Sequence, residues 1–200
     1  MKIEYFDSKK HDSIKVANLI YETDIEFNEL IFGKKVQAIA FISKLLTIKA
    51  GFYTKPYLQC IIKDNEIIGI VSGYNLGYRA KIDRAVGSAF IRAFGFFGFL
   101  RRLGVLLKLN RALSGKMSKS GYYIVYLCVG SEYRGLGTGK NVIEYLSKSY
   151  PLLYLHVSVI NFSAIRFYEA NGFKKIYESK VLIRKQVHAT FTMQKETITV

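Results

Sequence analysis

The chain has 200 residues, of which 50% are apolar and only two are proline, so it is long enough for a single domain over residues 1–200 and is not a low-complexity protein. Its formal net charge of +15 indicates an anionic partner, such as a phosphate, an acidic substrate, nucleic acid or anionic lipid, but says nothing about the fold. The two cysteines, Cys60 and Cys128, lie in apolar runs and are expected to be buried free thiols in a reducing compartment. The N-terminal stretch lacks the apolar core of a secretory signal, so a cytoplasmic protein is expected.

Strand-like and helix-like segments follow one another in the first part of the chain. Apolar residues recur at helical spacing in two places, and two β-rich runs flank a turn at Asp64–Glu66, which predicts a hairpin. The expected elements are a strand at Met1–Phe6, a helix from Asp12 or Ser13 to Tyr21, a helix from about Lys34 to Ile48, and strands at Leu58–Lys63 and Ile67–Tyr74.

Most of the excess charge lies in an insertion at about residues 75–121. This segment holds one acidic residue, Asp83, against ten basic ones, and so supplies nine of the fifteen excess charges. Gly95, Gly98 and Gly104 favour two short helices over one long helix. The basic residues are Arg79, Lys81, Arg84, Arg92, Arg101, Arg102, Lys108, Arg111, Lys116 and Lys119.

The apolar stretch Ser88–Leu109 within this insertion is long enough to span a bilayer. It carries four basic side chains, however, and each costs about 2.5–3.5 kcal/mol at mid-bilayer. We therefore expect no transmembrane segment.

The second part of the chain begins with Tyr122–Val129, a continuous apolar run that predicts a central strand buried on both faces. The later elements are expected to be a helix from Thr138 to about Ser149, a strand at Leu152–Val159, a helix that closes at Asn171–Gly172, and strands at Ile176–Ile183 and His188–Met193.

The string SEYRGLGTGKNVIEYL follows the run at Tyr122–Val129 and places three glycines before a helix, which favours anion binding. A Walker A loop requires four residues between its glycines, whereas three separate Gly135 from Gly139. The dinucleotide fingerprint fails because its sixth position is Lys140. The string instead fits the pattern Arg/Gln-x-x-Gly-x-Gly/Ala, from Arg134 to Gly139.

This loop resembles the first signature of the GNAT superfamily of N-acetyltransferases, in which it binds the pyrophosphate of acetyl-coenzyme A. The string LHVSVINFSAIRFYEANGF resembles the second signature, a strand, an Asn, and a helix that bears Phe-Tyr-Glu and ends in Gly-Phe. The resemblance covers most of the chain outside the insertion. It implies an α/β (α+β) fold of the acyl-CoA N-acyltransferase type, with a central mixed, mostly antiparallel sheet flanked by helices and a helical basic insertion between strands 3 and 4.

The resemblance implies acetyl transfer from acetyl-coenzyme A to a primary amine by direct attack. Tyr168 matches the family's tyrosine near the sulfur and is the expected general acid, because a neutral phenol with a pKa near 10 can protonate a thiolate. An N–H group of the strand before the loop would polarise the thioester carbonyl. The implied cofactor-binding residues are Leu127, Cys128, Val129, Arg134, Gly135, Leu136, Gly137, Thr138, Gly139, Lys140 and Asn161.

Three of these residues also have structural interpretations. Tyr168 can simply pack, Asn161 can cap the helix that follows it, and Arg134 can be a solvated surface charge. Because the three histidines are scattered and neither cysteine has metal-ligand spacing, no metal site is expected.

The general base is not assigned by the sequence. Several family members use a carboxylate on the strand before the loop, but Tyr122–Val129 contains no Asp or Glu. Tyr126 or His156 acting through water, and Glu132 or Glu29, remain open as candidates, with His156 more in keeping with a core or relay histidine.

Two functions remain for the chain. The first is an enzyme that acts on a small-molecule or protein amine; the second is a non-catalytic acyltransferase-like module that binds coenzyme A and an anionic partner through the insertion. The insertion itself is interpreted as a packed lid or helical hairpin, as a membrane-surface segment, or as a site for an acidic or phosphate-bearing acceptor, such as a ribosomal protein on RNA. The resemblance also allows a homodimer.

Overall fold

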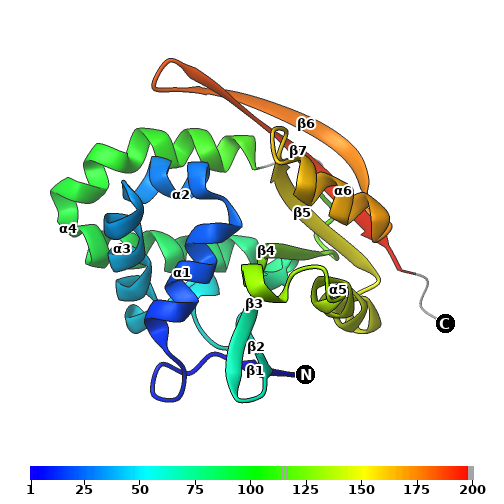
Figure 1. Ribbon diagram of the computed structural model, residues 1–200. Helices are drawn as coiled ribbons and strands as arrows, with labels where there is room; N and C mark the ends of the chain where they lie inside the picture. Colours follow the sequence, from blue (N-terminus) through cyan, green and yellow to red (C-terminus); the bar gives the residue numbers. More distant parts are fainter. Residues whose placement is uncertain (114, 116, 198–200) are drawn as a thin grey trace.

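A seven-stranded sheet runs through the centre of the molecule, in the order β1-β2-β3-β4-β5-β7-β6 (Figure 1). The computed structural model describes residues 1–113, 115 and 117–197. Neighbouring strands are antiparallel except β4 and β5, which are parallel, so the predicted mixed, mostly antiparallel sheet is confirmed. The strands are β1 (Lys2–Tyr5), β2 (Leu58–Lys63), β3 (Glu66–Asn75), β4 (Tyr122–Val129), β5 (Leu152–Ser158), β6 (Lys174–Ile183) and β7 (Gln186–Glu196).

Helices cover both faces of the sheet (Figure 1). Four helices share one apolar core with one face, and the other two share a second core with the opposite face. The first group is α1 (Ser13–Thr23), α2 (Ile25–Phe32), α3 (Lys35–Ile48) and α4 (Arg79–Ala112), and the second is α5 (Thr138–Ser149) and α6 (Phe162–Ala170). Neighbouring residues of β3 point to opposite cores, Ile70 to the first and Val71 to the second, as strand geometry requires.

The sequence predicted every one of these elements except α2. Asp24 begins this helix as its N-cap and accepts a hydrogen bond from the Phe27 N–H group at 2.9 Å. An N-cap aspartate followed by apolar residues is a known start signal, but the helix is only eight residues long and follows α1 directly. The sequence therefore shows one helical stretch where the structure has two helices and a sharp corner at Asp24.

The expectation that β4 is buried on both faces is wrong in part. Tyr122, Ile124 and Cys128 are buried, but the three residues from Val125 to Leu127 are only half-buried. The reason is that β5 accompanies β4 only over its first three residues, as described below.

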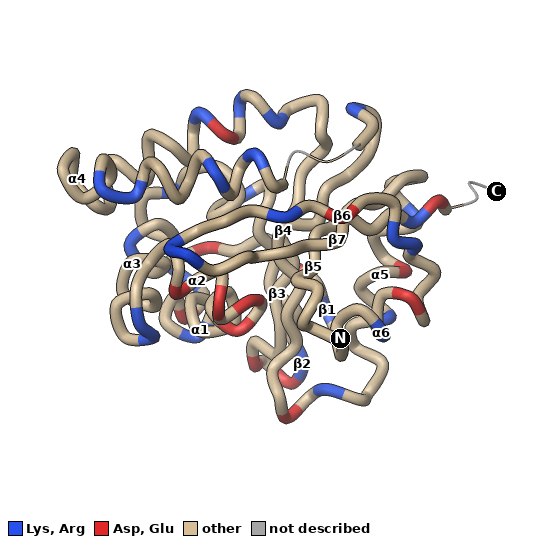
Figure 2. Tube along the Cα trace, turned by 90° about the horizontal axis from the view of Figure 1, so that it is seen from above, with Lys and Arg blue, Asp and Glu red and all other residues tan. Residues whose placement is uncertain are grey.

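The insertion folds as a helical hairpin. Helix α4 contains one non-helical residue, Gly95, with φ 72° and ψ 166°, and its two arms lie side by side (Figures 1 and 2). The arms meet again at their far ends, where the Arg79 guanidinium donates to Asn110 Oδ1 and to the Leu113 carbonyl, both at 3.3 Å. The prediction of two helices is confirmed; Lys116, which belongs to the same predicted insertion, lies outside the described residues.

Specific contacts fix the hairpin to the domain. Lys44 Nζ on α3 donates to the Ala93 carbonyl at 2.9 Å, and Arg102 Nε donates to the Ile31 carbonyl at 2.9 Å. The Arg102 guanidinium also lies 4.4 Å from the centre of the Phe94 ring, a cation–π contact. In the described part of the chain, none of the helices combines the length and the apolar character that a bilayer-spanning segment needs.

The backbone of Gly95 provides a test of the hairpin. Its φ/ψ values are accessible essentially only to glycine, and a Cβ there would meet no atom within 4 Å, so Gly95→Ala probes the backbone alone. We expect the free energy of unfolding to fall by about 1–3 kcal/mol. Gly104→Ala, at an equally open position inside the second arm, should instead raise it by up to about 1 kcal/mol. Urea denaturation measures both, and a loss of equal size in the two variants would contradict the observed turn.

Candidate active site

The pairing of β4 changes abruptly at Val125. On the β3 side, Ser72 pairs with Tyr126 and Gly73 with Ile124, so Val125 is an extra residue, a β-bulge. On the other side, the pairing of β4 with β5 ends at Ile124 and Leu155. Beyond this point the two strands diverge, and no strand of the described chain pairs with the backbone groups of β4 on that side.

A cavity of about 480 Å³, here called the loop cavity, opens where the strands diverge. It is bounded by the end of β4, by the loop before α5 and by α6. Leu136 does not line it, because its side chain points to solvent and is 66% exposed. All the other predicted site residues line it, namely Leu127, Cys128, Val129, Arg134, Gly135, Gly137, Thr138, Gly139, Lys140, Asn161 and Tyr168.

The glycines of the loop have distinct structural tasks. Gly135 and Gly137 have φ values of 77° and 78°, which glycine adopts without strain, and Gly137 is also the N-cap of α5. No side chain caps this helix, so its first N–H groups are available to an anion in the loop cavity. Gly139 allows α5 to approach α6, because a Cβ there would lie 2.9 Å from Phe167 Cζ.

Two cations border the loop cavity. Arg134 Nε donates to the Val129 carbonyl at 2.9 Å, and its guanidinium lies 3.5 Å from a Glu22 oxygen. Arg134 therefore ties the loop to the end of β4 and is more than a solvated charge. Lys140 lies 3.7 Å from Glu144, one turn further along α5, in a pair exposed to solvent.

Asn161 performs the capping role that was one of its two interpretations. Asn161 is the N-cap residue of α6, and its Oδ1 accepts a hydrogen bond from the Ala164 N–H group at 3.1 Å. It also lines the loop cavity, so the cap holds its side chain at the place where a cofactor contact is expected.

Tyr168 lies on α6 beside Cys128. Its ring packs between Phe167 and Phe173, at centroid distances of 5.1 and 5.4 Å. Burial, together with the neighbouring Cys128 thiol, raises the pKa of the Tyr168 phenol above its ordinary value. Among the described residues its hydroxyl has no hydrogen-bond partner. A packing role explains the ring of Tyr168 but not its hydroxyl group.

A second cavity of about 280 Å³, the aromatic cavity, lies on the other side of Tyr168. Leu127, Asn161, Ala164 and Tyr168 line both cavities, so the two meet at the diverging ends of β4 and β5.

The four candidate bases fall into two groups. Glu29 and Glu132 line neither cavity, whereas Tyr126 and His156 line the aromatic cavity. His156 is hydrogen-bonded at both ring nitrogens and is neutral, because burial, aided by Arg79, lowers its pKa to about 4. Its partners are the Tyr123 hydroxyl at 2.9 Å and Thr192 Oγ1 at 3.0 Å. His156 is therefore a satisfied core residue.

Asp24 is a residue that sequence reasoning missed. It lines the aromatic cavity from the corner between α1 and α2, and burial of its carboxylate raises its pKa. The Phe27 N–H group and His188 oppose this rise, and Glu26 adds to it. Only the N-cap signal could have drawn attention to Asp24, since nothing in the sequence places it opposite β4.

Both cysteines are free and buried, as predicted. Burial raises the pKa of the Cys128 thiol to about 11, so it is a poor nucleophile at neutral pH. Within the described ranges, no group of three His, Cys, Asp or Glu side chains could hold a metal ion.

Comparison with known proteins agrees with this geometry. Residues 39–173 match the Acetyltransferase (GNAT) family. No curated protein sequence matches the chain closely enough to compare.

Three solved structures show the same fold over nearly the whole chain. An N-acetyltransferase from Staphylococcus aureus Mu50 aligns with a TM-score of 0.67 and 15% identity, over 97% of this chain and 100% of its own. A second structure, of an acetyltransferase, aligns with a TM-score of 0.63 and 19% identity, over 98% of this chain and 100% of its own. The ribosomal-protein-S18-alanine N-acetyltransferase of Escherichia coli aligns with a TM-score of 0.54 and 12% identity, over 100% of this chain and 95% of its own.

Proposed function

Because this chain belongs to the acetyltransferase (GNAT) family, we propose that it transfers the acetyl group of acetyl-coenzyme A to a primary amine by direct attack. One observation carries the proposal. The unpaired edge of β4, the uncapped start of α5 and the Tyr168 hydroxyl all border one cavity. These are the three groups that a thioester attached to a pyrophosphate requires.

The cofactor would lie along the loop cavity. Its pyrophosphate is received by the N–H groups of the loop and the first turn of α5, where the helix dipole is positive, with Lys140 nearby. The pantetheine runs along β4 beside Leu127–Val129, where it takes the place of the missing strand. The Val129 carbonyl already accepts from Arg134, so the pantetheine pairs with the remaining backbone groups there. An N–H group there stabilises the oxyanion that develops on the thioester carbonyl.

The reaction forms a C–N bond and breaks the C–S bond of the thioester. The acceptor ammonium group first releases one proton to solvent, and the neutral nitrogen then attacks the thioester carbon. As the C–S bond breaks next to Tyr168, the departing sulfur takes up one proton and the nitrogen gives up its second, so coenzyme A leaves as the thiol. The raised pKa keeps the Tyr168 phenol protonated at physiological pH, so it remains a hydrogen-bond donor to the departing sulfur. No feature of the loop cavity favours the non-catalytic module over the enzyme.

Calorimetry with acetyl-coenzyme A tests where the cofactor binds. Gly137→Glu adds a carboxylate where the pyrophosphate is proposed to lie, and no atom within 4 Å obstructs the new Cβ. Its φ of 78° strains any residue but glycine, so circular dichroism first verifies that the variant is folded. We expect affinity to fall at least tenfold, because like charges at about 4 Å repel by roughly 4 kcal/mol near a protein surface. Ser149→Glu, the same change of charge at the exposed far end of α5, should bind as the wild type does. If folded wild-type protein does not bind acetyl-coenzyme A, the proposed acetyl transfer is refuted.

Tyr168→Phe tests the proposed acid. The ring contacts with Phe167 and Phe173 are kept and the hydroxyl has no described partner to lose, so stability should not change. We expect kcat to fall by about a hundredfold, the typical contribution of one proton or hydrogen-bond donor. The affinity for acetyl-coenzyme A should stay the same. Steady-state kinetics with thiol detection measures the effect, and an unchanged kcat would leave Tyr168 with a packing role only.

A further inference from the structure

The aromatic cavity is the feature that the proposed function leaves without an occupant. It meets the loop cavity at Tyr168 and Leu127, so a molecule inside it can reach the same point as the thioester. Its volume of about 280 Å³ lies just below the range of about 300–1,000 Å³ that is typical of small-molecule sites. The cavity therefore suits a compact ligand.

Nine of the 30 residues that line it are phenylalanine or tyrosine. The Tyr53 and Tyr126 hydroxyls are hydrogen-bonded at 3.2 Å, and the ring of Phe52 meets that of Tyr126 edge to face at 5.6 Å. These contacts hold the rings in place before any ligand binds. The aromatic residues that line the cavity are Phe27, Phe32, Phe52, Tyr53, Tyr74, Phe90, Tyr123, Tyr126 and Tyr168.

The charges in this cavity are opposite to those of the whole molecule. Two carboxylates line it, Asp24 and Asp83, against one cation, Arg79. Asp83 is paired with Arg79 at 3.6 Å, whereas no ion pair of Asp24 occurs among the described residues. His188 acts on Asp24 and lowers the pKa of its carboxyl, but this imidazole is itself paired with Glu26 at 2.9 Å, so in the described part of the chain no ion pair occupies the Asp24 carboxylate.

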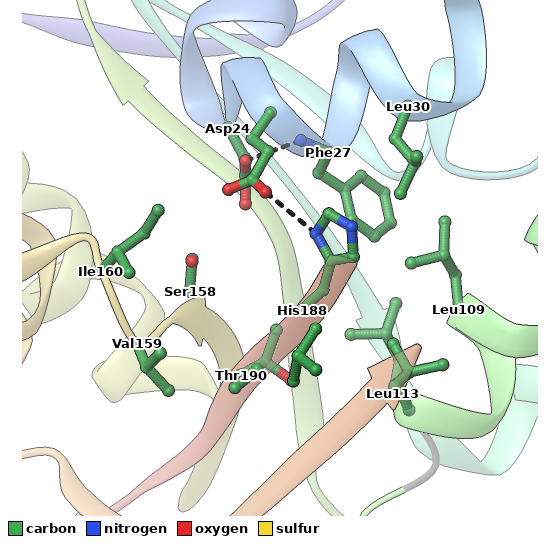
Figure 3. A pocket seen from close by; sticks show the side chains of 15 residues that line it. Asp24, Phe27, Leu30, Leu109, Leu113, Ser158, Val159, Ile160, His188 and Thr190 are labelled. Carbon is green, nitrogen blue, oxygen red and sulfur yellow. Dashed lines mark hydrogen bonds and ion pairs between the residues drawn. The ribbon is translucent and has the colours of Figure 1, made fainter. Parts of the chain in front are cut away.

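A smaller cavity adjoins the aromatic cavity at Asp24. The outer cavity, of about 100 Å³, lies between the start of α2, the end of α4 and β7, and shares Asp24 and Phe27 with the aromatic cavity (Figure 3). Glu26 on α2 and His188 on β7 pair across it at 2.9 Å. Acidic side chains therefore lie on both sides of the boundary between the two cavities, Asp24 in both and Glu26 in the outer one.

We propose that the aromatic cavity binds the acceptor, a compact aromatic primary amine, with its ring among the aromatic side chains and its ammonium group at Asp24. This assignment rests on the acetyl transfer proposed above. A ring gains contact with rigid aromatic walls, and an ammonium group gains an unpaired carboxylate in a partly buried place. An acidic or strongly polar amine would leave its own groups unpaired there.

A panel of amines tests the class of acceptor. With saturating acetyl-coenzyme A, we expect kcat/KM for 2-phenylethylamine to exceed that for n-butylamine, spermidine, glutamate and an alanyl tripeptide at least tenfold. Preference for any of the last four overturns the assignment. Calorimetry with acetyl-coenzyme A on the same sample separates the two proposals: binding without this preference refutes the acceptor alone, and no binding refutes the transfer.

Asp24→Asn tests the ammonium site. Asparagine caps helices as well as aspartate does, so the cap on Phe27 N–H is kept while the charge is lost. We expect kcat/KM for 2-phenylethylamine to fall about a hundredfold, with unchanged affinity for acetyl-coenzyme A and unchanged inhibition by the uncharged analogue 2-phenylethanol. Glu29→Gln removes the same charge from α2 outside the cavities and should retain wild-type activity. Equal losses in both variants would overturn the role of Asp24.

A separate observation concerns the tip of the α4 hairpin, which projects from one end of the molecule (Figures 1 and 2). Phe96, Phe97 and Leu100 are 64%, 79% and 53% exposed. Arg92 and Arg101 beside them are exposed as well. The opposite side of the hairpin is fixed to α2 and α3, so these side chains cannot turn inward without breaking the contacts of Lys44 and Arg102.

We propose that this tip docks on an anionic membrane surface. Exposed aromatic and aliphatic side chains flanked by arginines suit the interface between headgroups and acyl chains. Basic residues continue along both arms (Figure 2), so a second copy of the chain would be repelled, whereas an anionic surface is attracted.

Vesicle co-sedimentation tests the tip. We expect binding to vesicles of phosphatidylcholine with phosphatidylserine, weaker binding to phosphatidylcholine alone, and a loss of at least tenfold in the double variant Phe96→Ser/Phe97→Ser. Leu182→Ser removes a side chain of similar exposure, 57%, from β6 and should bind as the wild type does. Undiminished binding by the double variant, or an RNA affinity that this variant abolishes without any vesicle binding, would overturn the proposal.

Discussion

The bulge at Val125 is the feature on which the whole site depends. Two parallel strands joined by a crossover helix would normally stay paired along their length, and then neither cavity could exist. The extra residue in β4 increases the local twist and bends the strand away from β5 after three pairs. Gly73 allows this, because a Cβ there would lie 2.6 Å from the Tyr123 carbonyl oxygen. The two cavities are thus two consequences of one irregularity in the sheet.

The same divergence explains why the loop can hold an anion. When β4 leaves β5, the chain turns into α5 at Gly137 without a capping side chain, and the first N–H groups of the helix face the space between the strands. A serine or aspartate at this cap would satisfy those groups internally and would add bulk or negative charge. Glycine leaves them free for a ligand.

Local patterns in the sequence predicted most of the fold and the residues of the loop cavity, but not those of the aromatic cavity around Asp24. The glycine loop, the strand before it and Tyr168 lie in two continuous stretches, so their spacing alone indicates the chemistry. Burial of β4 could not be predicted correctly, because the bulge changes which core a side chain faces: Ile124 belongs to one core and Cys128 to the other. Asp24 was missed for a similar reason, since it reaches the aromatic cavity only through the packing of α1 and α2 against the sheet.

The distribution of charge suits the proposed reaction between an anionic cofactor and a cationic acceptor. A net charge of +15 attracts the phosphates of acetyl-coenzyme A from a distance and repels a free ammonium group. At physiological salt this field fades over about 8 Å, so the proposed attraction between Asp24 and an amine acts only once the amine is close to that carboxylate. A bound cofactor neutralises part of the positive field near the loop. The same charges that recruit the cofactor therefore oppose the acceptor less once the cofactor is in place, which favours binding of acetyl-coenzyme A before the amine.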